Sequence, residues 1–514
     1  MAVSAEGVGL LGIDGVMVEV QVSTQDGLPG MDITGLPSAS IRESRHRVRS
    51  ALKTCGYGWP QKRLIANFAP ADLHKSGTAY DLVFAAALLR LQGLVPADEV
   101  QTAAFFGELA LNGLVRPVPG AINAALAARN AGKERLFVAP ESAAEAAAVP
   151  DIQVVAVDSL VHLVRFLRLE VPYIGAQSVP ALATERVADV DLAHVKGQLH
   201  ARRALEVAAA GGHNLLLVGP PGCGKTLLAR ALPGILPDLD LLESLEVTQI
   251  HSVAGTFSRD RTLIRRRPFR APHSSASYAA LVGGGNPPMP GEVSLAHRGV
   301  LFLDETPEFS RSALEALRAP LEDRRVAISR ANRRITFPAA FSLVCALNPC
   351  PCGYKGDPAR ACHCTARQVE AYRERLSGPL MDRIDMHVAL ESVPPEELAK
   401  RPQGETSKAV RERVLGARER QRKRSRHEGP AVVNADLNNE QLLRWANLGP
   451  EESLHLVRAA RALGLTARSW NRVIKVARTI ADLDGADEVS TTHLSEALSY
   501  RLLDRRGTSA SGRR

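Results

Sequence analysis

The octapeptide GPPGCGKT occupies residues 219–226 and directly follows the apolar run NLLLV at residues 214–218. The run has the composition of a buried parallel strand and LLA at residues 227–229 begins a helix, so this GxxxxGKT pattern has the context that phosphate binding requires. Its glycines let backbone N–H groups point at phosphate oxygens, its lysine reaches the β- and γ-phosphates, and its threonine hydroxyl binds Mg²⁺. We therefore expect ATP or GTP to bind at Gly219, Pro220, Pro221, Gly222, Cys223, Gly224, Lys225 and Thr226.

The length and composition indicate a large folded protein. A chain of 514 residues is too long for one hydrophobic core, and 45% hydrophobic with 23% charged residues is typical of soluble domains. No window reaches the roughly 18 continuous apolar residues of a membrane span, and no cationic leader precedes an apolar stretch, so we expect a cytoplasmic protein with no membrane partner. The net charge of +9 fits an acidic partner such as nucleic acid, but many soluble proteins are basic, so charge alone leaves the partner open.

Changes in sequence texture predict an α/β multidomain protein. In the first part, short β-like runs alternate with alanine-rich helical stretches, which predicts an α+β domain. Around the phosphate-binding loop, alternating strands and helices predict a doubly wound α/β domain with a parallel sheet. The expected division is an α+β domain at 1–168, a linker at 169–189, the P-loop ATPase core at 190–395 with a Cys-rich insert at 350–364, a basic helix and helical lid at 396–505, and a disordered tail at 506–514.

Three further motifs complete a predicted ATPase site. The strand VLFL ends in Asp304 and Glu305 at the carboxyl edge of the sheet, where Asp304 would hold Mg²⁺ through water and Glu305 would polarise the attacking water. The strand FSLVCAL ends in Asn348, whose amide could sense the γ-phosphate. Arg383, within SGPLMDRID, suits an arginine finger that reaches the nucleotide of a neighbouring subunit. An acidic pair can also be ordinary surface, but the complete phosphate-binding loop favours catalysis.

These motifs resemble the magnesium-chelatase-like group of AAA+ ATPases and, within it, the ComM/YifB family. Three further stretches carry the same resemblance: RAPH at 270–273, PGEVSLAH at 290–297 and TARSWNRVIKVARTIADL at 466–483. The resemblance runs through essentially the whole chain. It implies a ring, usually a hexamer, that binds ATP and Mg²⁺ between subunits, with Arg383 acting in trans and Arg468 as the second sensor arginine. It also implies a DNA helicase that drives branch migration during recombination in natural transformation.

The N-terminal part raises a rival function. FGELALNGLVRPVPG at residues 106–120 resembles a strand and turn of the Lon protease domain, which has a ribosomal S5-like fold and a Ser/Lys dyad. Aligning the glycine turns places Ala79 and Ile122 where that family has serine and lysine, and neither can act as nucleophile or base. Ser76 and Lys75 lie nearby but are neighbours in sequence. We therefore expect a Lon-like fold without its dyad, and an ATP-dependent protease remains an alternative.

A magnesium-chelatase-type motor, which powers metal insertion into a tetrapyrrole, is the second alternative. Its motor core would look the same. Subunits of that kind do not usually carry a Lon-like domain, and no integrin-like metal-binding module is evident in the chain, so the resemblance favours DNA as the partner.

Two basic segments are candidates for DNA contact. RRVAISRANRRITF at 324–337 has two β-like runs joined by a polar turn, which predicts a hairpin. Related motors project such a hairpin into the ring pore, where Arg330, Arg333 and Arg334 would bind phosphates of single-stranded or branched DNA. A solvated hairpin is the alternative, because no aromatic residue sits at the turn to stack on bases. The Arg-rich helix at 408–427 could likewise contact DNA or be a solvated face.

Four of the seven cysteines crowd into a short segment as CPC and CHC. In a reducing cytoplasm this crowding indicates metal binding before disulfides. The glycines and proline between the two pairs let the loop fold back, so four thiolates could close a tetrahedral structural Zn²⁺ site at Cys350, Cys352, Cys362 and Cys364. The CxC spacing departs from the commoner CxxC knuckle and His363 is a spare ligand, so free thiols remain the alternative.

Overall fold

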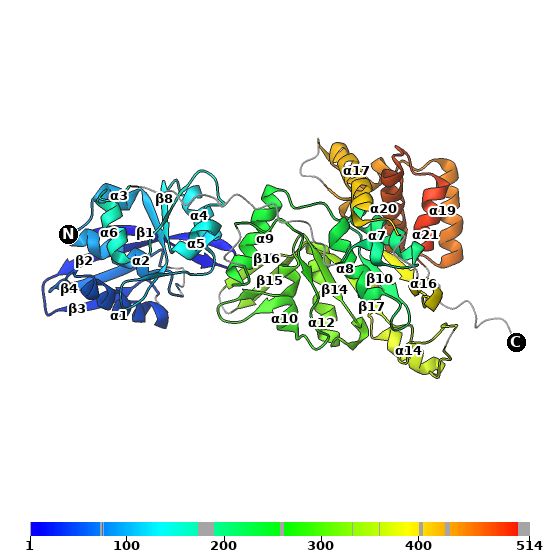
Figure 1. The fold of residues 1–514 in the computed structure, drawn as a ribbon, viewed down its shortest axis with the longest axis horizontal. Helices are drawn as coiled ribbons and strands as arrows, with labels where there is room; N and C mark the ends of the chain where they lie inside the picture. The colour runs from blue at the N-terminus through cyan, green and yellow to red at the C-terminus, as the bar shows by residue number, and fades with distance from the viewer. Residues whose placement is uncertain are drawn as a thin grey trace.

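The chain folds into three parts: the N-terminal part forms one end of the long axis of the molecule, and the C-terminal helices lie beside the central part towards the other end (Figure 1). The structure is a computed structural model that describes residues 2–36, 38–71, 75, 77–172, 190–257, 262–330, 333–358, 360–399, 404–426 and 432–501. Most of the predicted linker, Ser76 and the predicted tail lie outside these described residues. Among the helices that the structure describes, none combines the length and the apolar character needed to cross a membrane.

The N-terminal part is built on a seven-stranded mixed sheet. In spatial order its strands are β3 (Gly30–Thr34), β4 (Arg63–Ala69), β2 (Asp14–Gln25), β1 (Ala2–Leu11), β5 (Ala103–Phe106), β8 (Arg135–Val138) and β9 (Gln153–Ala156). β1 and β2 pair as a long antiparallel hairpin, whereas β5, β8 and β9 extend the sheet in parallel. The accompanying elements are α1 (Ala39–Thr54), α2 (Asp81–Leu91), α3 (Ala97–Gln101), β6 (Glu108–Leu109), β7 (Val115–Arg116), α4 (Ala121–Asn130), α5 (Pro140–Ala146) and α6 (Leu160–Leu167).

Five parallel strands form the sheet of the central part. In spatial order they are β11 (Phe269–Arg270), β14 (Val300–Leu303), β17 (Ser342–Leu347), β10 (Leu215–Val218) and β18 (Met386–Ala389). Along β10, Leu215 and Leu217 face one apolar cluster while Leu216 and Val218 face another, as the two-residue period of a strand requires. Both faces of the sheet are therefore buried, which explains why the strands are continuously apolar and confirms the predicted parallel α/β core.

The connections between these strands carry the helices and two small hairpins. The helices are α7 (Leu199–Gly211), α8 (Lys225–Ile235), α9 (Leu241–Val253), α10 (Tyr278–Val282), α11 (Glu292–Leu295), α12 (Arg311–Ala316), α13 (Arg318–Asp323), α14 (Ala366–Glu374) and α15 (Gly378–Met381). One hairpin pairs β12 (Gly283–Gly284) with β13 (Met289–Pro290). The other pairs β15 (Arg325–Arg330) with β16 (Arg333–Pro338) and confirms the predicted basic hairpin, although its turn residues, 331–332, lie outside the described residues.

The C-terminal part is helical, as predicted. Its helices are α16 (Pro395–Ala399), α17 (Ser407–Ser425), α18 (Asn439–Ala446), α19 (Pro450–Leu463), α20 (Ala467–Asp484) and α21 (Thr491–Ser499). Leu205 of α7, Val414 of α17 and Ile480 of α20 are all fully or almost fully buried in one apolar cluster that also includes strand residues of the central sheet. These helices therefore share a core with the sheet and are fixed against one of its faces.

Helix α9 joins the central part to the N-terminal domain. The hydroxyl of Ser252 accepts a hydrogen bond from the backbone N–H of Gly120 at 2.8 Å and donates one to the carboxylate of Glu145. Glu145 also accepts from the N–H of Ile122 at 3.0 Å. Leu245 adds an apolar contact to the N-terminal domain. Burial raises the pKa of Glu145, so this junction is a dry, hydrogen-bonded contact.

Candidate nucleotide-binding site

The phosphate-binding loop leaves β10 and turns directly into α8, the geometry that aims a helix N-terminus at an anion. Gly222 and Gly224 both have left-handed backbones, with φ of +80° and +95°. A Cβ placed on either glycine would meet no atom within 4 Å, so the loop backbone faces open space. The local sequence builds a cradle that a phosphate chain can enter.

Lys225 is held by oxygen atoms at the base of this cradle. Its ammonium donates to the carbonyl oxygens of Gly219 at 2.7 Å and Pro220 at 2.9 Å, and to Oδ1 of Asn348 at 3.0 Å. Burial is the largest influence on Lys225 and lowers its pKa. The structure thus brings the end of β17 to the phosphate-binding lysine, although Asn348 lies 123 residues further along the chain.

A pair of oxygen donors fits Mg²⁺ beside the lysine. The Thr226 hydroxyl donates to Oδ2 of Asp304 at 2.8 Å, and Oδ1 of Asp304 accepts from the N–H of Glu305 at 3.0 Å. A hydroxyl and a carboxylate are ligands that Mg²⁺ prefers, so Thr226 and Asp304 suit the metal of a nucleotide complex. Glu305 has a left-handed backbone, φ +47°, which a non-glycine residue adopts at a cost of about 1–2 kcal/mol and which is common where geometry serves function.

These groups line one cavity of about 560 Å³, a size usual for small-molecule sites. The sequence predicted most of its wall: Pro221, Gly222, Gly224, Lys225, Thr226, Asp304, Glu305 and Asn348. Val190, Leu227, Arg230 and Leu347 also line it and were not predicted. Arg230 lies five residues after Lys225 on α8, and only that proximity to the motif could have drawn attention to it. The remaining loop residues, Gly219, Pro220 and Cys223, lie behind the cradle, where two of them supply carbonyls to Lys225.

Arg383 and Arg468 lie together, outside the cavity of their own chain. Arg383 is 8% exposed and donates to the carbonyl of Pro379 at 2.6 Å and to the carboxylate of Glu322. The exposed Arg468 lies 3.7 Å from a carboxylate oxygen of Asp382. The hydrogen bond from Arg383 lowers the pKa of Glu322, and the positive charge of Arg468 adds to this effect. The two predicted arginines therefore lie in one charged cluster, and neither lines the nucleotide cavity of its own chain.

The four predicted cysteines meet around one point. Their sulfur atoms all lie within 4.8 Å of one another, and Cys350 Sγ lies 3.4 Å from that of Cys352 and 3.6 Å from that of Cys362. Tetrahedral Zn²⁺ with Zn–S bonds of about 2.3 Å places its ligands roughly 3.8 Å apart, so the observed spacing suits a four-thiolate site. His363, the spare candidate, is absent from this group.

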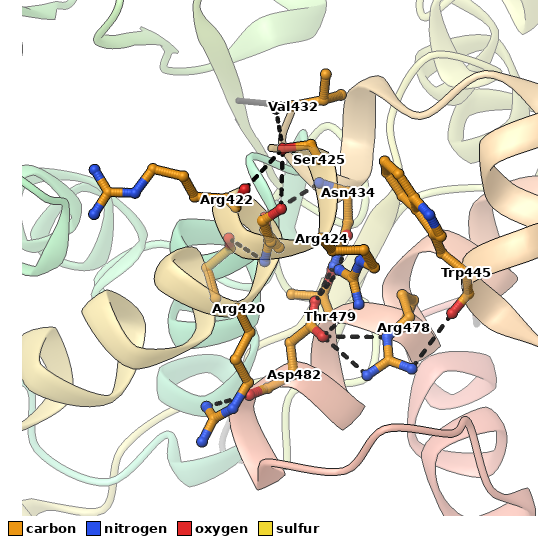
Figure 2. Close-up of polar contacts among 12 residues, drawn as sticks. Arg420, Arg422, Arg424, Ser425, Val432, Asn434, Trp445, Arg478, Thr479 and Asp482 are labelled. Carbon is orange, nitrogen blue, oxygen red and sulfur yellow. Dashed lines mark hydrogen bonds and ion pairs between the residues drawn. The ribbon is translucent and has the colours of Figure 1, made fainter. Parts of the chain in front are cut away.

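Three arginines of α17, Arg411, Arg418 and Arg424, are paired within the protein, whereas Arg413, Arg420 and Arg422 are exposed. Figure 2 shows Arg424, Arg478 and Asp482 facing one another between α17 and α20. Arg424 donates to both oxygens of Asp482, at 2.9 and 2.8 Å, and Arg420 donates to its backbone carbonyl at 2.8 Å. Arg418 donates to the carbonyl of Ala209 at 2.7 Å. These side chains fasten the helix to its neighbours, and the sequence alone could not separate this role from a DNA-binding or solvated face.

The N-terminal domain has no catalytic dyad at the positions predicted from the Lon resemblance. Ala79 and Ile122 both lie in one apolar cluster and carry only aliphatic side chains. Lys75 is fully buried and donates to the carbonyls of Gly35 and Pro70, while Ser76 lies outside the described residues. At Ala79 and Ile122 the domain therefore offers neither a nucleophile nor a base.

Comparison with known proteins places the chain in a family. The family model described as magnesium chelatase, subunit ChlI, matches residues 191–398, that of subunit ChlI of Mg-chelatase matches residues 18–142, and that of the ChlI C-terminal region matches residues 404–501. The chain is 44% identical over 497 residues to the uncharacterized protein YifB of Escherichia coli and 42% identical over 507 residues to the competence protein ComM of Haemophilus influenzae, covering 96% of both chains in each case. It is also 44% identical over 495 residues to an uncharacterized protein of Mycobacterium tuberculosis, covering 96% of this chain and 97% of the relative.

This similarity spans nearly the full length of each relative, and the cavity holds the groups that ATP and Mg²⁺ require. The chain belongs to the ComM/YifB family of magnesium-chelatase-like AAA+ ATPases.

Proposed function

We propose that the protein is an ATP-hydrolysing ring motor that moves DNA, a helicase that drives branch migration in recombination during natural transformation. The observation that carries this proposal is the position of the basic hairpin, β15 and β16, in the chain. It lies between β14, which ends at Asp304 and Glu305, and β17, which ends at Asn348. α12 and α13 connect Glu305 to the hairpin, and residues 339–341 connect the hairpin to the start of β17, so movement at the nucleotide site can be passed to it along the chain. The Haemophilus influenzae relative is named a competence protein, which supports the pathway.

The charge on the hairpin supports an anionic partner. Arg330 pairs directly with Arg333 across the two strands, next to the turn, and the side chain of Arg334 is exposed. Phosphates of a bound DNA strand would neutralise the positive charge that this hairpin carries. Tyr278, at the start of α10, is 54% exposed and is available to stack on a base. α10 runs into Gly283, where a Cβ would lie 3.1 Å from Ile328 of β15.

We propose that the protein self-associates into a ring, a hexamer as is usual in the family, and the arginine cluster supports this proposal. Arg383 and Arg468 would complete the nucleotide site of the next subunit, where their charge would stabilise the phosphoryl group as it is transferred. Glu322, which accepts a hydrogen bond from Arg383, lies three residues before Arg325, where the hairpin begins. Arg383, as the arginine finger, and the basic hairpin of the same subunit would thus move together in response to the ATP of the neighbouring subunit.

The DNA proposal is tested by ATP hydrolysis, strand displacement and branch migration on defined single-stranded, forked and three-stranded DNA. We expect DNA to stimulate hydrolysis and the Glu305→Gln variant to bind DNA without moving it. Replacing Arg330, Arg333 and Arg334 with alanine should lower DNA affinity and reduce the slope of log affinity against log salt by about 2, because each single-strand phosphate contact contributes about 0.7. The matched control removes three exposed charges at the C-terminal end of α17 and directly after it, Arg422, Lys423 and Arg426. An unchanged slope in the hairpin variant would remove the hairpin from the proposal.

One observation favours a second candidate, a chelatase-type motor for metal insertion, since all three matching family models describe the ChlI subunit of magnesium chelatase. Such a motor would hydrolyse ATP without stimulation by any of the DNA substrates. A Lon-like protease would instead cleave casein with ATP, which the aliphatic residues at Ala79 and Ile122 argue against. The same protein preparation can be assayed for all three activities.

We also propose that Cys350, Cys352, Cys362 and Cys364 hold a structural Zn²⁺. The sulfur geometry supports it, and four thiolates leave no open position for catalysis. Elemental analysis of protein purified without chelator should find about one zinc per chain, the stoichiometry of a single four-ligand site. Absence of zinc from wild-type protein purified in this way would refute the assignment.

A further inference from the structure

The cysteine cluster lies against the phosphate-binding loop. Cys350 is separated from Asn348 by a single residue. The next turn ends at Gly353, whose N–H donates to the carbonyl of Cys350 at 3.0 Å and whose φ is +88°. A Cβ on Gly353 would lie 2.7 Å from Cδ of Pro221, so only glycine fits here without displacement. The loop that carries the first two cysteines therefore touches the loop that receives the phosphates.

The helix after the cluster holds Asn348 from the other side. α14 starts immediately after the second cysteine pair, and Thr365 caps it through a reciprocal capping box. Tyr372 of this helix is 7% exposed and hydrogen-bonds to the backbone of Asn348. The chain therefore leaves Asn348, passes both cysteine pairs and returns to Asn348 through Tyr372. The sulfur cluster ties the outgoing and returning segments together.

We propose that Zn²⁺ in this cluster positions Asn348 for ATP hydrolysis; this inference rests on the zinc site proposed above. A metal that links the two cysteine pairs closes the loop and restricts the segment that carries Asn348. Oδ1 of Asn348 lies 3.0 Å from the ammonium of Lys225. A small displacement of this segment would therefore shift the amide of Asn348 away from its position beside the γ-phosphate site. The cysteines line no part of the nucleotide cavity and are positioning residues that act through Asn348.

The test removes the distal cysteine pair and separates binding from turnover. In the double variant Cys362→Ser/Cys364→Ser, zinc should be lost, and kcat for DNA-free ATP hydrolysis should fall about tenfold to a hundredfold, the usual range for groups that orient a functional residue. The dissociation constant for ATP should change by less than about twofold, because the phosphate-binding loop, Thr226 and Asp304 remain. Retained ATP binding shows that the variant is folded. Cys55→Ser, in the N-terminal domain, is the matched control and should keep both zinc and kcat.

A double-mutant cycle distinguishes positioning from general stabilisation. Asn348→Ala should lower kcat as the cysteine variant does, and combining the two should cost no more than Asn348→Ala alone, because groups that act through one residue are not additive. Additive losses, or zinc loss with unchanged kcat, would overturn the inference while leaving the zinc site in place. Absence of zinc from the wild-type protein would overturn both. Since the assay contains no DNA, its outcome is independent of the proposed DNA motor.

Discussion

Removing the carboxylate of Asp482 should detach the C-terminal helices from the core. Asp482 is fully buried and accepts from Arg424 at 2.9 and 2.8 Å, from Arg478 at 3.2 and 2.9 Å and from Asn434 at 2.7 Å (Figure 2). Asp482→Ala leaves two guanidinium groups without their shared counter-charge, and Arg478 is only 1% exposed. Removing one partner of a buried ion pair typically costs about 3–5 kcal/mol, and we expect a loss in this range for the C-terminal helices.

The assay is denaturant unfolding followed by tryptophan fluorescence. Trp445 is a local probe, since the guanidinium of Arg424 lies 5.4 Å from its ring centre. The control is Asp484→Ala, two residues further along the same helix, where a half-exposed carboxylate lies 3.4 Å from Arg203. An exposed pair contributes about 1 kcal/mol or less, so this change should barely shift the unfolding midpoint. Equal, small losses in both variants would refute the view that the α17 arginines fasten the helices together.

Three other predictions address the nucleotide site and its support. Lys225→Ala should abolish tight ATP binding, whereas Glu305→Gln should bind ATP and hydrolyse it very slowly; fluorescent-nucleotide titration and phosphate release separate the two outcomes. Arg383→Ala should bind ATP normally but lose ring-dependent hydrolysis. Mixing this variant with Lys225→Ala should restore some activity, because each variant supplies the group that the other lacks. If Arg383→Ala alone still hydrolysed ATP, Arg383 would not be an arginine finger. The hydrogen bond from His297 lowers the pKa of Glu246 to about 2 from 4.5, so its stabilising contribution is present above pH 4.5 and is lost as the pH falls towards 2. In the Glu246→Gln variant, the protection of β14 amides from hydrogen exchange should change less with pH over this range than in the wild-type protein.

Local patterns were sufficient to predict the nucleotide site. A buried strand, a glycine-rich loop and a helix start are encoded by neighbouring residues, and the chemistry of phosphate binding restricts which residues fill the loop. Asp304, Glu305 and Asn348 could be assigned because the carboxyl ends of parallel strands meet at one edge of the sheet, which the Asn348–Lys225 contact bears out. The hairpin at β15 and β16 was likewise predictable from two β-like runs and a polar turn.

The sequence by itself thus determined a parallel α/β core of an AAA+ ATPase, most of the residues that line its cavity and a compact cysteine cluster. Only the tertiary structure decided which partners the basic residues have. Arg424 meets Asp482 across 58 residues of sequence, and a run of arginines looks the same whether its counter-charge is a distant carboxylate, solvent or DNA. The grouping of Arg383 with Arg468 and the contact of Gly353 with Pro221 also depend on packing between distant segments, which no local period or spacing encodes.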